Sequence, residues 1–168
     1  QRPFETDESP DQRVVAAVSS LGVIATQPVV ETMFRRYRRG VDLDDDTEGV
    51  VKPQKALWDA RQVLGPDDVL LCDVGAHKMW VARYYQCHEP NTCLIPNGFC
   101  SMGFALPGAI AASMLYPDRR ILAVCGDGGF LMNVQEMETC TRTGAHPVVM
   151  VWEDGGYGLI AWKQENEF

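Results

Sequence analysis

The sequence predicts an α/β fold: a doubly wound, mostly parallel sheet with helices on both faces. Short apolar runs rich in β-branched residues alternate with segments of helical periodicity. The runs show no apolar–polar alternation, which is typical of parallel strands that are covered on both faces. Glycine-rich and polar turns follow these runs, and ligands of open α/β sheets bind at the carboxyl ends of strands. We therefore expect the functional residues to lie in those turns.

Composition limits the class of protein. The chain has 168 residues, 46% of them apolar, and a formal net charge of −8. This is enough to bury the core of one ordinary domain, and the acidic balance argues against a nucleic-acid partner, which needs a basic face. No apolar run is long enough to predict a membrane span, and the first residues lack the apolar centre of a secretory signal. Six cysteines without a C-x-x-C pair favour a reduced, cytoplasmic protein over a disulfide framework.

Residues 1–50 are expected to be a linker or part of a preceding segment. Residues 14–24 are apolar and predict a short buried element, and residues 29–39 predict a helix with arginines on one side. An acidic, glycine-ended stretch follows at residues 42–49. Both charged stretches are interpreted as solvated surface or linker.

Residues 51–168 have a clearer order. A helix is predicted from Pro53, which suits a first turn, to the break at Gly65 and Pro66, because apolar residues recur between them at helical spacing. Strands are predicted at residues 69–72, 92–95, 121–125 and 148–152, and further helices at residues 79–85, 103–116 and around 134–141. Turns follow the four strands at residues 73–77, 97–102, 126–129 and 154–156. In a parallel sheet one edge brings these turns together.

The turn at residues 126–129 places the carboxylate of Asp127 among three glycines, directly after a buried strand. Strand, turn and helix in this order present backbone N–H groups to a phosphate, but Asp127 would repel a bare phosphate. A divalent cation binds carboxylate and phosphate oxygens together and removes that repulsion. The 25 residues between Gly128 and Asp154 are the length of one helix and one strand, so Asp127 and Asp154 are candidates to share Mg²⁺ with a carbonyl near Gly156. The alternative, two ordinary turn aspartates, stays open.

Two other phosphate motifs fit less well. A P-loop needs a lysine followed by serine or threonine after its glycines, and none follows here. A dinucleotide-binding fingerprint needs a third glycine where this chain has Leu131.

The turn and the spacing resemble the cofactor motif of thiamine diphosphate (ThDP) enzymes, which begins with Gly-Asp-Gly and ends near a pair of asparagines. Asp154 and Gly155 stand at those last positions, a departure similar to the Asp-Asn pair of the catabolic, FAD-independent acetolactate synthases. Residues 72–80, 97–107, 126–131 and 157–160, with Glu136 and Glu138, also agree with that family. The resemblance covers about residues 51–168 and implies the ThDP-binding fold. The domain is expected to be incomplete and truncated at its C-terminus.

The resemblance implies a role for each matching residue. Asp127, Asp154 and the Gly156 carbonyl would bind Mg²⁺. Met102 would hold the cofactor in its bent form, and its N–H and the Cys100 carbonyl would contact the aminopyrimidine. The other cofactor-binding positions would be Val74, Gly75, Ala76, His77, Gly128, Gly129 and Tyr157. Without the family, the residues themselves favour a satisfied turn histidine at His77, and the alternative for Met102 is a core residue.

The resemblance also implies a function. The parent would be a Mg²⁺-dependent acetolactate synthase-like transferase or lyase of branched-chain amino acid biosynthesis, which decarboxylates pyruvate and condenses it with a second 2-oxo acid. The activating glutamate would come from the N-terminal pyrimidine-binding domain of a second subunit in a homo-oligomer. This chain would then hold no catalytic residue and be inactive alone. Two alternatives stay open: a ThDP-dependent decarboxylase of another 2-oxo acid, and a non-catalytic domain that binds cofactor or protein through the arginine run at residues 35–39.

Overall fold

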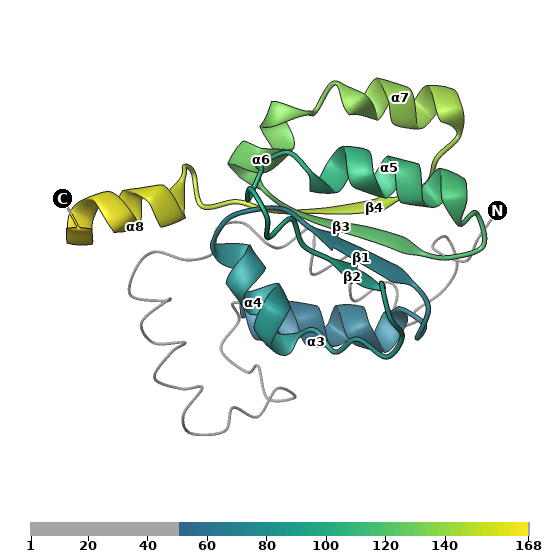
Figure 1. The fold of residues 1–168 in the computed structure, drawn as a ribbon, viewed down its shortest axis with the longest axis horizontal. Coiled ribbons are helices and arrows are strands. Elements are labelled where there is room, and N and C mark those ends of the chain that lie inside the picture. The colour runs from purple at the N-terminus through teal and green to yellow at the C-terminus, as the bar shows by residue number, and fades with distance from the viewer. Residues whose placement is uncertain (1–50, 168) are drawn as a thin grey trace.

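A computed structural model describes residues 51–167 of the chain (Figure 1). The elements that the sequence predicts within residues 1–50 lie outside this range, as does the final residue. Within the described range no helix has both the length and the apolar character needed to cross a membrane.

The centre of the fold is a four-stranded parallel sheet with the strand order β2-β1-β3-β4. The strands are β1 (Val69–Cys72), β2 (Cys93–Leu94), β3 (Ile121–Gly126) and β4 (Val148–Trp152). Val69 pairs with Ile121, and Gly126 with Trp152. Because all four strands run in the same direction, their carboxyl ends lie together at the same end of the sheet. The predicted parallel sheet is confirmed.

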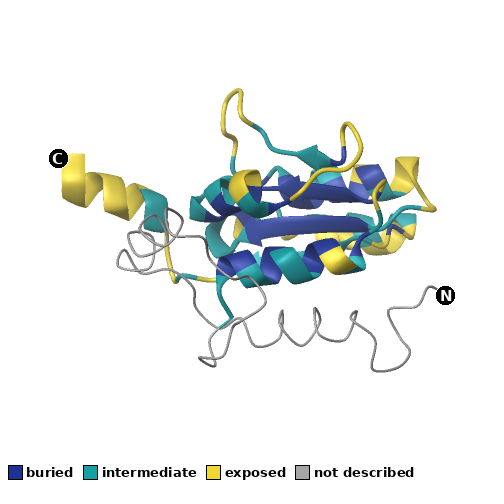
Figure 2. Cartoon of the chain, turned by 90° about the horizontal axis from the view of Figure 1, so that it is seen from below, coloured by how far each residue is buried: buried dark blue, intermediate teal, exposed yellow. Residues whose placement is uncertain are grey.

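Helices cover both faces of the sheet, which confirms the doubly wound architecture (Figure 1). One face carries α3 (Pro53–Val63) and α4 (Ala76–Tyr84), and the other carries α5 (Ala105–Leu115) and α7 (Glu136–Thr143). The short α6 (Asp127–Met132) directly follows β3, and α8 (Gly158–Glu167) extends away from the body and buries no residue. The central strands are the most buried: all of β1 and the first five residues of β3 are buried, whereas the edge strand β2 is half-buried (Figure 2).

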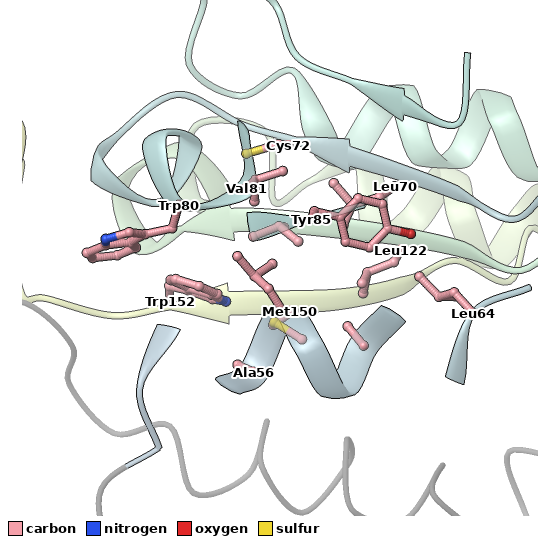
Figure 3. Close-up of a cluster of buried hydrophobic side chains, with 13 residues drawn as sticks. Ala56, Leu64, Leu70, Cys72, Trp80, Val81, Tyr85, Leu122, Met150 and Trp152 are labelled. Carbon is pink, nitrogen blue, oxygen red and sulfur yellow. The ribbon is translucent and has the colours of Figure 1, made fainter. Parts of the chain in front are cut away.

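Each face of the sheet has its own apolar core. Beneath α3 and α4 the core combines aliphatic residues such as Leu57 and Met150 with the rings of Trp80 and Trp152, whose centroids are 5.4 Å apart (Figure 3). On the other face the small residues of α5 let this helix lie close to the strands. A Cβ atom at Gly108 would come within 2.8 Å of the Leu71 side chain. This contact explains the run of small residues that the sequence shows in α5.

Several elements differ from the sequence-based expectations. Helix α4 begins at Ala76, so His77, predicted in a turn, lies in its first helical turn. The predicted strand at residues 92–95 shortens to the two residues of β2, at the edge of the sheet. The glycine turn is itself helical, and the single helix predicted after it is divided into α6 and α7. The division occurs at Asn133, whose side-chain amide donates to the Gly103 carbonyl at 2.6 Å. Helix α8 was not predicted.

Candidate cofactor site

A pocket lies where the strand order changes direction. From β1 the chain goes to the outer strand β2, then returns across the sheet to β3 on the other side of β1. Such a switch point leaves a crevice between the loops that follow the two central strands, and ligands of open α/β sheets bind there. The pocket at this position is lined by the turns after β1, β3 and β4 and by the loop before α5.

Most of the predicted site residues line this pocket. They are Val74, Gly75, Ala76, His77, Met102, Asp127, Gly128, Gly129, Asp154 and Gly156. Gly126 and two tryptophans, Trp80 and Trp152, also line it, although sequence reasoning did not select them. Two predicted residues do not line it. Cys100 is exposed in the loop before α5, and the ring of the half-exposed Tyr157 lies against the backbone of Gly128.

Asp127 and Asp154 come together in the pocket because β3 and β4 are adjacent. Asp127 stands at the start of α6, where one carboxylate oxygen accepts the Gly128 N–H at 2.8 Å and the other accepts the Gly155 N–H at 3.1 Å. The Asp154 carboxylate accepts the Gly156 N–H at 3.3 Å. Burial, and then the charge of Asp127, raise the pKa of Asp154. A carboxylate whose ionisation is opposed by the charge of a neighbouring carboxylate marks a place where a cation would be stabilised.

The donor set suits magnesium with a phosphate ligand. Among residues 51–167 no three His, Cys, Asp or Glu side chains gather in an arrangement that could hold a metal ion. A transition-metal centre built from side chains alone is therefore not supported in this part of the chain. Mg²⁺ commonly takes only one or two carboxylates and completes its shell with phosphate oxygens and water. Two aspartates beside exposed backbone groups match that requirement.

The glycines of the motif are needed for close packing around the pocket. A Cβ atom at Gly128 would lie 2.6 Å from the ring of Tyr157, and one at Gly129 would lie 2.6 Å from the carboxylate of Asp73. Real Cβ atoms do not approach other heavy atoms so closely. The backbone of α6 can therefore stay at the pocket wall with a side chain at position 129 only if the buried Asp73 moves, and with one at position 128 only if the half-exposed Tyr157 ring moves.

His77 is buried in the pocket wall with its Nε2 atom unpaired. Burial lowers the pKa of His77 to about 4, although a hydrogen bond with the Asp73 backbone and the charge of Asp127 act in the opposite direction. The indole nitrogen of Trp152, whose ring centroid is 6.4 Å from that of His77, is also buried without a partner. Buried polar atoms without partners are uncommon in native proteins. The unpaired Nε2 of His77 is therefore an atom that a ligand in this pocket would satisfy.

Sequence reasoning missed Asp73, which is fully buried beneath the pocket. Its carboxylate accepts the N–H of Val74 at 2.7 Å and the N–H of Gly103 at 3.0 Å with each oxygen. Burial raises the pKa of Asp73, whereas these donors lower it. Asp73 therefore joins the turn after β1 to the loop before α5. A signal was present, because Asp73 follows the β1 run as Asp127 follows β3.

Comparison with known proteins agrees with this geometry. Residues 73–168 match the family described as thiamine pyrophosphate enzyme, C-terminal TPP binding domain. The chain is 37% identical over 116 residues to an acetolactate synthase of Bacillus subtilis (strain 168), a match that covers 69% of this chain and 20% of that protein. It is 33% identical over 131 residues to a catabolic acetolactate synthase of Raoultella terrigena, covering 78% and 23% of the two chains.

The chain thus belongs to the C-terminal, TPP-binding domain family of thiamine pyrophosphate enzymes. Within that family it is a TPP-binding domain like those of acetolactate synthases. A probable acetolactate synthase large subunit of Methanocaldococcus jannaschii is 28% identical over 153 residues, which is 88% of this chain and 26% of that protein. The chain spans about a fifth to a quarter of the length of these relatives.

Proposed function

We propose that this chain binds ThDP through Mg²⁺ and forms the diphosphate-binding part of an acetolactate synthase-like enzyme. The observation that carries the proposal is the meeting of Asp127 and Asp154 at the carboxyl ends of two adjacent parallel strands, in the wall of one pocket. The unpaired Nε2 of His77 in the same wall adds a group that a diphosphate oxygen would satisfy. The residues present therefore fit the cation and the cofactor that the family implies.

Each part of the pocket has a task in this proposal. Asp127, Asp154 and the carbonyl of Gly156 hold Mg²⁺. Gly128, Gly129 and residues 74–77 hold the diphosphate, the two glycines through their N–H groups. Met102 supports the bent cofactor, and Cys100 and Tyr157 contact it from the loops that flank the pocket. The two tryptophans and the buried strands exclude water from the inner wall, which strengthens the electrostatic attraction between the cation and the diphosphate.

When bound, ThDP supplies the electron sink that decarboxylation of a 2-oxo acid requires. This chain contributes binding, orientation and charge neutralisation. The glutamate that activates the aminopyrimidine belongs to a pyrimidine-binding domain of a second subunit, so the isolated chain is inactive. Pyruvate is the first substrate and a second 2-oxo acid the acceptor, in a homo-oligomer that works in the cytoplasm.

Isothermal titration calorimetry tests the proposal. ThDP is titrated into the chain with Mg²⁺ and, separately, with EDTA, and thiamine, which lacks the diphosphate, serves as the matched control ligand. We expect heat of binding only for ThDP with Mg²⁺. Equal affinity in EDTA, or no binding by a sample whose circular dichroism shows a folded chain, would contradict the proposed site. The second of these results would favour the alternative of a protein-binding domain.

A further inference from the structure

The side-chain nitrogen of Lys78 and the sulfur of Cys100 lie next to each other at the edge of the candidate site. Lys78 lies in the first turns of α4 and Cys100 in the loop before α5, 22 positions later. The Lys78 ammonium donates to the Cys100 sulfur at 3.3 Å. Both backbones are held in place: Lys78 N–H donates to the Gly75 carbonyl at 3.1 Å and Cys100 N–H to the Pro96 carbonyl at 3.0 Å. The two atoms are neighbours because of the fold and not because of the sequence.

Cys100 differs from the other five thiols, all of which lie in the described part of the chain. Burial raises the pKa of Cys72, Cys93, Cys125 and Cys140, which disfavours the reactive thiolate form of these residues. Cys87 is exposed like Cys100, but its described side-chain contact is the Cys93 thiol and not an amine. Exposure to an oxidant and contact with an amine thus coincide at Cys100.

We propose that Lys78 and Cys100 form a reversible covalent cross-link when the protein meets a peroxide. Hydrogen peroxide first oxidises the Cys100 thiol to a sulfenic acid, and the peroxide O–O bond is reduced with release of one water. The Lys78 amine, after losing a proton, then attacks the sulfur. An S–N bond forms, the S–OH bond breaks, and a second water leaves. A free thiol reverses the link: it takes the sulfur into a mixed disulfide and releases the amine.

The link would have two consequences. It ties α4 to the loop before α5 and so restricts the unfolded chain, which stabilises the fold. It also converts the ammonium into a group without charge. Lys78 directly follows His77, and its charge acts on that ring by lowering the pKa of His77. Loss of this cation next to a diphosphate pocket weakens the attraction for an anionic ligand. This second consequence rests on the proposed ThDP site, whereas the cross-link itself does not.

Mass spectrometry of the oxidised chain tests the link directly. The 168-residue chain is treated with hydrogen peroxide, digested and analysed. We expect a cross-linked peptide that joins Lys78 to Cys100, with the summed mass of the two peptides less two hydrogens, and its loss after dithiothreitol. The link should be absent in Lys78→Arg and Cys100→Ser and present in Cys87→Ser, the matched exposed thiol. It should also be absent when the wild-type chain is oxidised in urea, because only the fold joins the two atoms.

Three results would overturn the proposal: oxidation of Cys100 to sulfinic acid while Lys78 stays free, a link of equal yield in urea, or a link that persists in Lys78→Arg. Circular dichroism of each variant shows whether it is folded. A second measurement is the ThDP affinity with Mg²⁺, which we expect to fall roughly two- to fivefold on oxidation and to recover with dithiothreitol, as for loss of one partly exposed charge. Failure of the reduced chain to bind ThDP would contradict the proposed function and leave the cross-link result standing.

Discussion

Both carboxylate oxygens of Asp73 accept the N–H of Gly103, at 3.0 Å each, although the two residues are 30 positions apart. Asp73 directly follows the central strand β1, and Gly103 lies in the loop before α5. The contact therefore fixes the loop that carries Met102 against the turn after β1, which leads into the first residues of α4 and His77. The buried carboxylate of Asp73 therefore holds the turn after β1 and the loop before α5 in fixed positions relative to each other.

Replacement of Asp73 by alanine should therefore destabilise the fold. It leaves the N–H groups of Val74 and Gly103 buried without an acceptor, and we expect a loss of about 2–4 kcal/mol in the free energy of unfolding. Asp73→Asn keeps one carbonyl oxygen and should lose less. Urea denaturation followed by tryptophan fluorescence measures both. An unchanged midpoint for Asp73→Ala would show that water or another group satisfies these donors.

Substitution of the two candidate metal ligands should weaken cofactor binding, and at Asp154 it should do so without a loss of stability. Because Mg²⁺ attraction depends on ligand charge, we expect Asp127→Asn and Asp154→Asn each to weaken Mg²⁺-dependent ThDP binding more than tenfold. The pKa of Asp154 is raised in the fold, so its ionised form is disfavoured there, and Asp154→Asn should not lower the melting temperature. Asp67→Asn, which removes an exposed carboxylate 3.7 Å from Arg119, is the control. Equal affinities in all three variants would remove both aspartates from the metal site.

Two adjacent glycines should respond differently to alanine. A Cβ atom at Gly129 would meet the fully buried carboxylate of Asp73 at 2.6 Å, and that group cannot move aside without losing its hydrogen bonds. A Cβ atom at Gly128 would meet the half-exposed ring of Tyr157, which can turn into solvent. We expect Gly129→Ala to lose more than about 2 kcal/mol of stability and Gly128→Ala less than about 1 kcal/mol. Thermal and urea unfolding of the matched pair would show whether the order is reversed.

His77 should make the stability of the ligand-free chain depend on pH. Burial lowers the pKa of His77 from its ordinary 6.5 to about 4, so between these values the unfolded chain binds a proton that the folded chain does not. The free energy of unfolding should therefore increase as the pH rises from about 4 to 6.5 and decrease as the pH falls through the same window. The change from this residue should be roughly 3 kcal/mol at most. Carboxylates also titrate near the lower end of this pH window, so the pH dependence of the wild type is compared with that of His77→Gln.

The measurement for His77 is a series of urea denaturations from pH 4 to pH 7. His77→Gln should show a flatter dependence than the wild type, and His146→Gln, which changes an exposed histidine, should follow the wild type. If the free energy of unfolding of the wild type and of His77→Gln depended on pH in the same way, protonation of the buried ring would not destabilise the fold, which would contradict the prediction.

The sequence predicted the features that depend on local pattern. The strands at Val69–Cys72 and Val148–Trp152 have the predicted bounds, because each is an apolar run between turn-forming residues. The meeting of Asp127 and Asp154 also followed from the sequence. Alternating strands and helices imply a parallel sheet, and parallel strands bring their carboxyl ends to one edge.

Other features depend on contacts between distant residues and could not be derived in this way. The break between α6 and α7 coincides with the hydrogen bond from Asn133 to Gly103, and the proximity of Lys78 to Cys100 depends on how α4 and a loop from the next unit pack. The sequence also could not distinguish the roles of Asp73 and Asp127, because both follow apolar strands. In the structure Asp73 is buried beneath the pocket, whereas Asp127 lines it.

By itself the sequence predicted the fold class, the end of the sheet where the candidate site lies and two acidic residues that line its pocket, since hydrophobic periodicity and spacing along one chain encode them. Only the tertiary structure decided which polar atoms stay unpaired, which glycines touch a neighbour, and which thiol has an amine beside it. Those properties belong to pairs of residues far apart in the chain, and packing alone sets the distance between them.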